Sequence, residues 1–208
     1  TMGQNSVGAA IVPGLTLLVI NIFVSIIVSF ASTSISREGN AFYNTKIMPV
    51  SYTTQILAKL FLYAAVGTAS VVLCTIVMAA AFSTESAGYL LKPLDVGCIF
   101  LISEMMVLSL TCLSIAADIK SPTFNVVGDG ELVSANKNMI VALLVGILVA
   151  AIYGIFTMVF SFLPLQMGTL QGTEAVYLIL SLLMVVILAC SVTALFANLE
   201  KRYQKIAP

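Results

Sequence analysis

The stretch that decides the fold is MIVALLVGILVAAIYGIFTMVFSFL, which spans residues Met139–Leu163. It carries no charged residue, and it is longer than the roughly 20 apolar residues that a transmembrane helix needs. Apolar and polar residues do not alternate along it with the period of two that marks a barrel strand. The stretch therefore predicts a helix that crosses a lipid bilayer.

Four more segments of this kind surround it, at Val7–Ser32, Tyr52–Phe82, Leu94–Ala117 and Ala175–Asn198. Hydrophobic residues make up 60% of the chain, charged residues 9%, and the mean hydropathy is +1.11. Soluble domains carry roughly 25% charged residues. The sequence predicts an all-α, polytopic membrane protein, with residues 1–208 forming one transmembrane domain of five spans and short amphipathic helices on the cytoplasmic side.

Lysine and arginine indicate the orientation of these spans. Eight of the nine basic residues fall on one side: Arg37, Lys46, Lys59, Lys120, Lys137, Lys201, Arg202 and Lys205. Only Lys92 falls on the other side. By the positive-inside rule, we expect the N-terminus outside and the C-terminus in the cytoplasm. An outside start without a signal sequence predicts that the chain is the C-terminal part of a longer protein, preceded by an odd number of spans.

Several classes of chemistry are disfavoured by what the sequence lacks. There is no histidine, and the four cysteines stand in apolar runs without CxxC spacing, so we expect no metal site and no catalytic triad. No GxxxxGK[ST] motif is present, so the chain is not expected to bind nucleotide phosphates. Net charge is zero and basic runs are absent, which argues against nucleic acid as a partner. We expect neither an enzyme nor a bound cofactor.

The first cytoplasmic loop, residues 35–51, predicts a short amphipathic helix. Ile35, Phe42, Tyr43 and Ile47 lie close to one helical face, and the helix must break before Pro49. Such a helix can rest on the lipid headgroups or dock a cytoplasmic partner. The periodicity leaves both interpretations open.

The second cytoplasmic loop, residues 118–138, contains turn residues at Pro122 and at Gly128-Asp129-Gly130. Residues 131–138 are expected to begin the next helix inside the cytoplasm. A partner surface and a plain solvated loop are both compatible with this pattern.

Together these two loops resemble the permease subunits of bacterial type-2 ATP-binding-cassette (ABC) exporters. In the first loop the resemblance lies in Ser36-Arg37-Glu38-Gly39, an aromatic residue at Phe42, Lys46, and the turn Met48-Pro49-Val50-Ser51. In the second loop it lies in Asp118, Pro122, Asn125 and Glu131. The hydropathy between the loops is similar to that of the C-terminal half of such permeases.

The resemblance implies a transport component of the bacterial inner membrane that couples to a separate cytoplasmic ATPase, which would bind ATP and Mg. It also implies a second permease partner, either the missing N-terminal half or another copy. Phe42, Tyr43 and Ile47 would then be packing anchors for the ATPase, with Arg37, Glu38 and Lys46 as charge partners and Pro49 in the turn. The substrate class stays open.

Polar residues inside the spans suggest a different possibility. Glu104 falls near the middle of the third span, where an ionised side chain costs at least about 2.5 kcal/mol, so it is expected to be neutral, paired or facing a watery path. Asn21 in the first span is a weaker candidate for such a path, since a single amide is commonly interhelical glue. Two rival functions follow: an ion-gradient-driven transporter or channel that uses Glu104, and a non-transporting membrane scaffold.

Overall fold

The structure is a computed structural model that describes residues 3–82, 93–124, 136–162, 166–167, 170–171 and 173–206. Its helices are α1 (Gly3–Ser25), η1 (Ile26–Thr33), η2 (Ser36–Ala41), α2 (Phe42–Ile47), α3 (Tyr52–Phe82), α4 (Pro93–Lys120), α6 (Lys137–Phe162), α7 (Thr173–Phe196) and α8 (Leu199–Gln204). Two short strands, β1 (Gln166–Met167) and β2 (Leu170–Gln171), pair antiparallel before α7.

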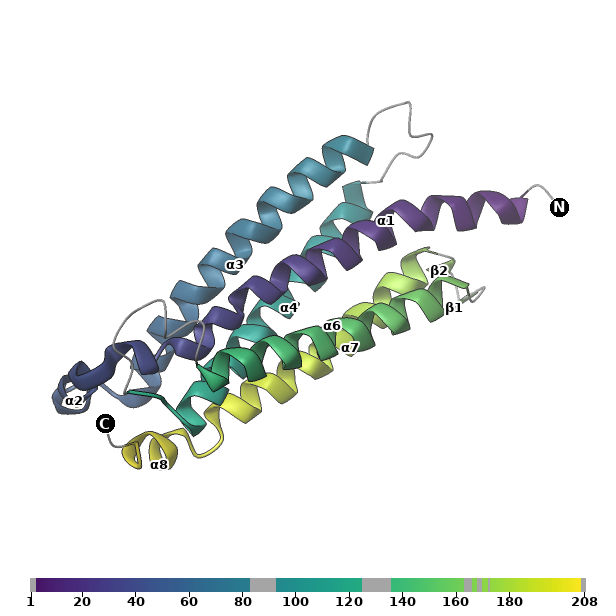
Figure 1. The fold of residues 1–208 in the computed structure, drawn as a ribbon. Coiled ribbons are helices and arrows are strands. Elements are labelled where there is room, and N and C mark those ends of the chain that lie inside the picture. Colours follow the sequence, from purple (N-terminus) through teal and green to yellow (C-terminus); the bar gives the residue numbers. More distant parts are fainter. Residues whose placement is uncertain are drawn as a thin grey trace.

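Among the described residues, five helical segments are long and apolar enough to cross a membrane: Gly14–Gly39, Tyr52–Ala81, Pro93–Lys120, Lys137–Val159 and Glu174–Phe196. This confirms the prediction of an all-α polytopic membrane protein. The long helices run side by side as an elongated bundle (Figure 1). The helices α2 and α8 and the C-terminus lie at one end of it, and the N-terminus and the β1–β2 pair lie at the other (Figure 1).

Helix α4 is the central element, because it contacts α1, η1, α3, α6 and α7. Its buried apolar residues between Ile99 and Leu110 belong to a core cluster that also includes Leu18 and Ile22 of α1, Tyr153 of α6 and Leu180 of α7. Those between Cys112 and Ile119 belong to a second cluster, which includes Phe42 and Tyr203. Buried hydroxyls on α4 donate to carbonyls of the preceding turn, as Ser103 does to Ile99. Such back-bonding lets a polar side chain be buried without an interhelical partner.

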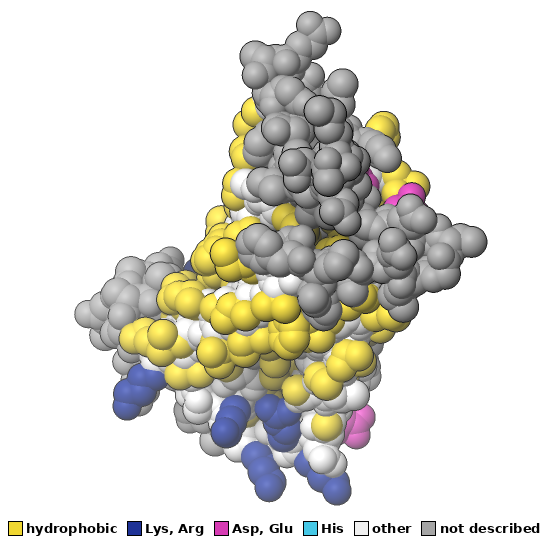
Figure 2. Space-filling model, turned by 90° about the vertical axis from the view of Figure 1, so that its right-hand side faces the viewer, with side chains coloured by type: hydrophobic (Ala, Val, Ile, Leu, Met, Phe, Trp, Pro, Cys, Tyr) yellow, Lys and Arg dark blue, Asp and Glu magenta, His cyan; other side chains and the backbone are white. Residues whose placement is uncertain are grey.

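The outer faces of α3, α6 and α7 carry exposed leucine, isoleucine, valine and phenylalanine side chains. Figure 2 shows this apolar surface as a band, with lysine and arginine side chains gathered below it at one end. We call that end, which holds η2, α2, α8, the end of α4 and the start of α6, the basic end. This pattern is typical of a membrane protein, in which apolar helix faces contact the lipid and charged side chains lie outside the hydrocarbon core.

The row Gly146, Ala150 and Gly154 on α6 supports close packing over only part of its length. A methyl group at Gly146 would lie 3.5 Å from the Ser29 hydroxyl, and Ala150 is buried. At Gly154 the same methyl group would meet nothing within 4 Å.

The closest helix approach among the described glycines is at Gly67 of α3. A methyl group there would lie 2.5 Å from Cγ1 of Val107 on α4 and 2.5 Å from Cγ1 of Val28 in η1. Both neighbours are β-branched, and their χ1 angles have little freedom to yield. Gly67 therefore sets how closely α3 can approach the bundle.

We expect the G67A variant to be less stable than the native chain by about 1–3 kcal/mol, the usual cost of overpacking. The matched control is G154A, which should be neutral or slightly stabilising because alanine favours helix by about 1 kcal/mol over glycine. Thermal unfolding of the purified protein in detergent measures both. Equal melting temperatures for the two variants would contradict the packing described at Gly67.

Candidate functional site at the basic end

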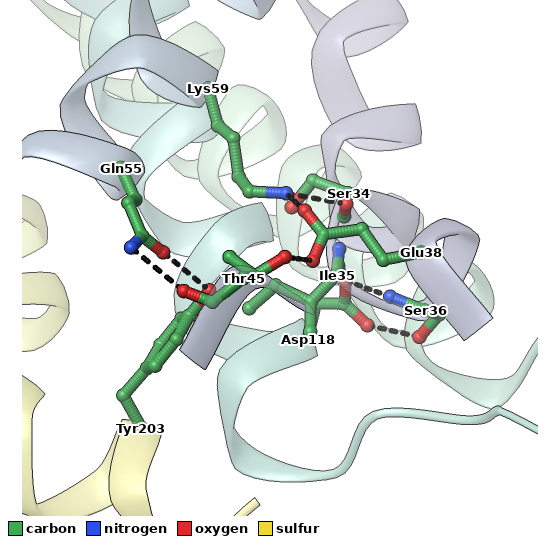
Figure 3. Close-up of polar contacts among 9 residues, drawn as sticks. All are labelled: Ser34, Ile35, Ser36, Glu38, Thr45, Gln55, Lys59, Asp118 and Tyr203. Carbon is green, nitrogen blue, oxygen red and sulfur yellow. Dashed lines mark hydrogen bonds and ion pairs between the residues drawn. The ribbon is translucent and has the colours of Figure 1, made fainter. Parts of the chain in front are cut away.

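Asp118, near the end of α4, is the centre of the polar structure at the basic end. Its carboxylate is fully buried and accepts four hydrogen bonds. Oδ2 accepts from the backbone N–H groups of Ile35 at 2.6 Å and Ser36 at 3.1 Å. Oδ1 accepts from the Ser36 hydroxyl at 2.5 Å and from Nδ2 of Asn138 at 3.3 Å. Figure 3 shows the carboxylate facing Ile35 and Ser36.

The donors of Asp118 are themselves held by neighbouring loops. Asn138 Nδ2 also donates to the Ser121 carbonyl at 2.7 Å, and the Ser121 hydroxyl donates to Asn138 Oδ1 at 2.9 Å. The backbone N–H of Thr123 donates to the Ser36 hydroxyl at 3.0 Å. The network therefore ties the start of η2, the end of α4 and the start of α6 into one unit.

A second set of polar contacts fixes the same loop to α3. Glu38 forms a salt bridge with Lys59 and accepts a hydrogen bond from the Thr45 hydroxyl at 2.9 Å. Lys59 also donates to the Ser34 carbonyl at 3.0 Å, and Gln55 Nε2 donates to the Thr45 carbonyl at 3.0 Å. Figure 3 shows these side chains converging on the loop from α3. Glu38, predicted as a charge partner for another protein, is thus engaged within the chain.

Aromatic side chains pack against the buried side of α2. Phe42 is fully buried, and its ring centroid lies 5.3 Å from that of Phe124 and 5.3 Å from that of Tyr203 on α8. The rings of Tyr52 and Tyr203 are 4.8 Å apart. Burial raises the pKa of the Tyr203 hydroxyl above its usual value. These rings bind α2, α3 and α8 into one apolar cluster.

Helix α8 is an element that the sequence reasoning treated only as a basic tail. The chain turns after α7 at Asn198, whose φ of 55° is left-handed, a conformation that asparagine tolerates at helix ends. Arg202 then donates to the carbonyls of Ala194 at 2.9 Å and Ala116 at 3.1 Å. The spacing of Leu199, Tyr203 and Ile206, all buried, is the signal that could have predicted it.

The predicted common face of the first loop differs from the one observed. Ile35 and Phe42 are buried, whereas Tyr43 is 60% and Ile47 63% exposed. Within α2, Tyr43 and Ile47 lie about 100° and 140° around the helix axis from Phe42, because each residue advances by about 100°. When Phe42 is buried, both side chains therefore face away from the core. The kink at Gly39, with φ of 51° and ψ of −131°, separates this helix from Ile35.

The outer side of the segment is consequently both apolar and exposed. We call it the outer patch; it consists of Tyr43, Ile47, Met48 and Val50. Arg37 and Pro49 are also exposed. The Lys46 side chain instead points toward α8. Its Nζ lies 5.6 Å from the centroid of the Phe42 ring and donates to the carbonyls of Gln204 and Ile206.

The remaining predicted residues lie elsewhere. Pro122 follows α4 in the described part of the second loop, while Asn125 and Glu131 lie outside the described residues. Glu104 lies fourteen positions before Asp118 on α4, about 21 Å along the helix axis at 1.5 Å per residue. It does not belong to the basic end.

Within the bundle, Asn21 and Glu104 each contact one hydroxyl of α3. Asn21 Nδ2 donates to Thr75 at 2.8 Å, and Thr68 donates to Glu104 Oε2 at 2.7 Å. Asn21 Oδ1 and Glu104 Oε1 are buried and have no hydrogen-bond partner among the described residues. Asn21 therefore links α1 to α3 by a hydrogen bond, and one carboxyl oxygen of Glu104 remains available to accept another.

In the described part of the chain, no group of three histidine, cysteine or acidic side chains is placed to hold a metal ion. No protein-family model, curated protein or solved structure matches this chain.

We expect D118N to destabilise the protein by about 1–3 kcal/mol, because the NH2 group that replaces one oxygen must face two of the four donors and leaves buried groups unpaired. Thermal unfolding measures the change. The control is E174Q, which removes a carboxylate from an exposed position at the other end of the bundle. If D118N unfolds at the same temperature as E174Q, the hydrogen bonds assigned to Asp118 are not stabilising.

Proposed function

We propose that this chain is a membrane-spanning permease subunit of an ABC-type exporter, coupled to a separate cytoplasmic ATPase. The observation that carries the proposal is the two-sided character of residues 35–51. Their inner side is fixed to the spans by hydrogen bonds and ring packing, and their outer patch is apolar and exposed. A transmission element requires both properties at once.

The inner side supplies stiffness. A displacement of α2 would act on α4 through Phe42 and the Asp118 network, and on α3 through the Glu38–Lys59 pair. Packed and hydrogen-bonded elements respond to a push as units and do not deform continuously. Movement at α2 would therefore be passed to the spans that line any pathway.

The outer patch supplies a docking surface. Partner interfaces typically depend on a few aromatic and aliphatic anchors, with charges at the rim. Tyr43 and Ile47 would be the anchors and Arg37 the rim charge, whereas Phe42, Glu38 and Lys46 would act by holding the segment in place. The competing interpretation, that the outer patch only rests on lipid headgroups, predicts no protein contact there.

The test places a single cysteine at Tyr43 in a chain whose native cysteines are replaced, co-expressed with a cassette ATPase. We expect a crosslink whose yield changes with ATP. The Y43S/I47S variant should weaken association by about tenfold or more, as loss of interface anchors does. The control N44A changes an exposed side chain between the two anchors. No crosslink, or equal association for both variants, would refute the proposal.

A second candidate function, ion-gradient-driven transport, is favoured by the partnerless buried oxygen of Glu104. A carboxyl near mid-span that keeps one oxygen free can take up a proton or a cation. The exporter proposal and this candidate differ in their energy source.

Dissipating the proton gradient with an uncoupler separates them. We expect transport to persist with ATP and to stop when the ATPase carries an inactive catalytic site. E104Q keeps the shape of the side chain and an oxygen for Thr68, and it should leave that ATP dependence in place. Transport that stops with the uncoupler and becomes gradient-independent in E104Q would instead establish the second candidate.

A further inference from the structure

An open cavity at the basic end has cationic side chains along part of its lining. It has a volume of about 360 Å³ and is lined by Ile119, Lys120, Pro122, Arg202, Lys205 and Ile206. Three of these six residues are cationic, and none is acidic. Small-molecule sites range from about 300 to 1,000 Å³, so the cavity suits a small group.

The cations come from two parts of the chain that the fold brings together. Lys120 is the last residue of α4. Arg202 lies in α8 and Lys205 directly follows it, and α8 contacts α3 and α4. Lys46 adds a further positive charge next to the lining, because it donates to the Ile206 carbonyl. Two carboxylates are close in sequence to these cations. Asp118 is buried and has its acceptors filled by Ile35, Ser36 and Asn138, and Glu200 is exposed and does not line the cavity.

Arg202 is positioned to recognise an anion. Two of the five N–H donors of a guanidinium are used by the Ala194 and Ala116 carbonyls, which fix the group in place. Three N–H donors remain, and guanidinium donors suit the oxygens of a phosphate group. Lys120 and Lys205 are exposed, so their ammonium groups can move to meet a ligand.

The location of the cavity gives the class of ligand. The apolar span of α4 ends at Lys120 and that of α7 at Phe196, so the cavity lies where lipid headgroups meet the protein. Figure 2 shows the basic side chains directly below the apolar band. Basic pockets between spans at this level are typical binding sites for anionic headgroups. Ile119, Pro122 and Ile206 supply an apolar wall beside the charges.

We infer that this cavity binds a phosphate group, carried by an anionic lipid or by a small soluble phosphate. The ligand would bridge the end of α4 and α8 and so stabilise the apolar cluster around Tyr203. The inference does not depend on the transport function, and ATPase association provides a separate readout for that function.

The test uses native mass spectrometry of the purified full chain, titrated with phosphatidylglycerol or with phosphatidylcholine. The K120Q/K205Q variant should bind phosphatidylglycerol about tenfold more weakly than the native chain, with phosphatidylcholine binding unchanged. The matched control K137Q/K201Q removes the same charge from two exposed lysines at the same end that do not line the cavity. It should bind phosphatidylglycerol as the native chain does.

The K120R/K205R variant keeps both positive charges and should bind phosphatidylglycerol like the native chain. This result would show that the charge matters and not the lysine side chain as such. Equal weakening in K120Q/K205Q and K137Q/K201Q would mean diffuse surface attraction and would overturn the inference. So would equal binding of the two lipids by the native chain, with no binding of inorganic phosphate.

Competition identifies the source of the phosphate. Inorganic phosphate or glycerol 3-phosphate is added at an ionic strength matched with chloride. Displacement of phosphatidylglycerol beyond the chloride control would identify a soluble phosphate as a ligand of the site. Selective lipid binding that neither soluble phosphate displaces would identify the headgroup, anchored also by its acyl chains.

Discussion

A carboxylate with no exposed surface needs hydrogen-bond donors around it, and Asp118 takes its donors from segments more than 80 residues apart. Two of the four are backbone N–H groups at the start of η2, which belong to the part of a helix that has no internal partner. The same carboxylate therefore satisfies helix-end donors and fixes where the chain leaves the first span. Without it, the two backbone N–H groups of residues 35–36 would lose the acceptor that they share on α4.

The rest of the basic end is built outward from that anchor. Once residues 35–36 are fixed, the kink at Gly39 directs Phe42 inward, where it meets Tyr203 and Phe124. Phe42 then leaves Tyr43 and Ile47 facing outward, because neighbouring positions on a helix point to different sides. The exposed apolar outer patch is thus a geometric consequence of a well-buried inner side.

The sequence predicted the spans well because hydropathy over about 20 residues is a property of the bilayer and needs no tertiary information. It did not predict which side of α2 is buried, because Phe42 and Tyr43 are both aromatic and only the contacts of Phe42 with Phe124 and Tyr203 decide between them. The kink at Gly39 also separates Ile35 from that helix. It missed α8 because six residues give a weak periodic signal and three of the neighbouring residues are basic. The internal pairing of Glu38 with Lys59 depends on contacts between two elements, which sequence spacing alone does not reveal.

The basic residues show why a charge count indicates an orientation but not a role. Lys59 neutralises Glu38, while Lys46 and Arg202 donate to backbone carbonyls at the ends of helices. Cations near such carbonyls are favoured by the helix dipole.

Five other cations make no hydrogen bond or ion pair with the other described residues: Arg37, Lys120, Lys137, Lys201 and Lys205. Of these five, Lys120 and Lys205 share a cavity with a guanidinium already fixed in place, so positive charge and a preorganised donor occur together there. A ligand bound there would gain from both, whereas the other free cations offer only charge to the solvent.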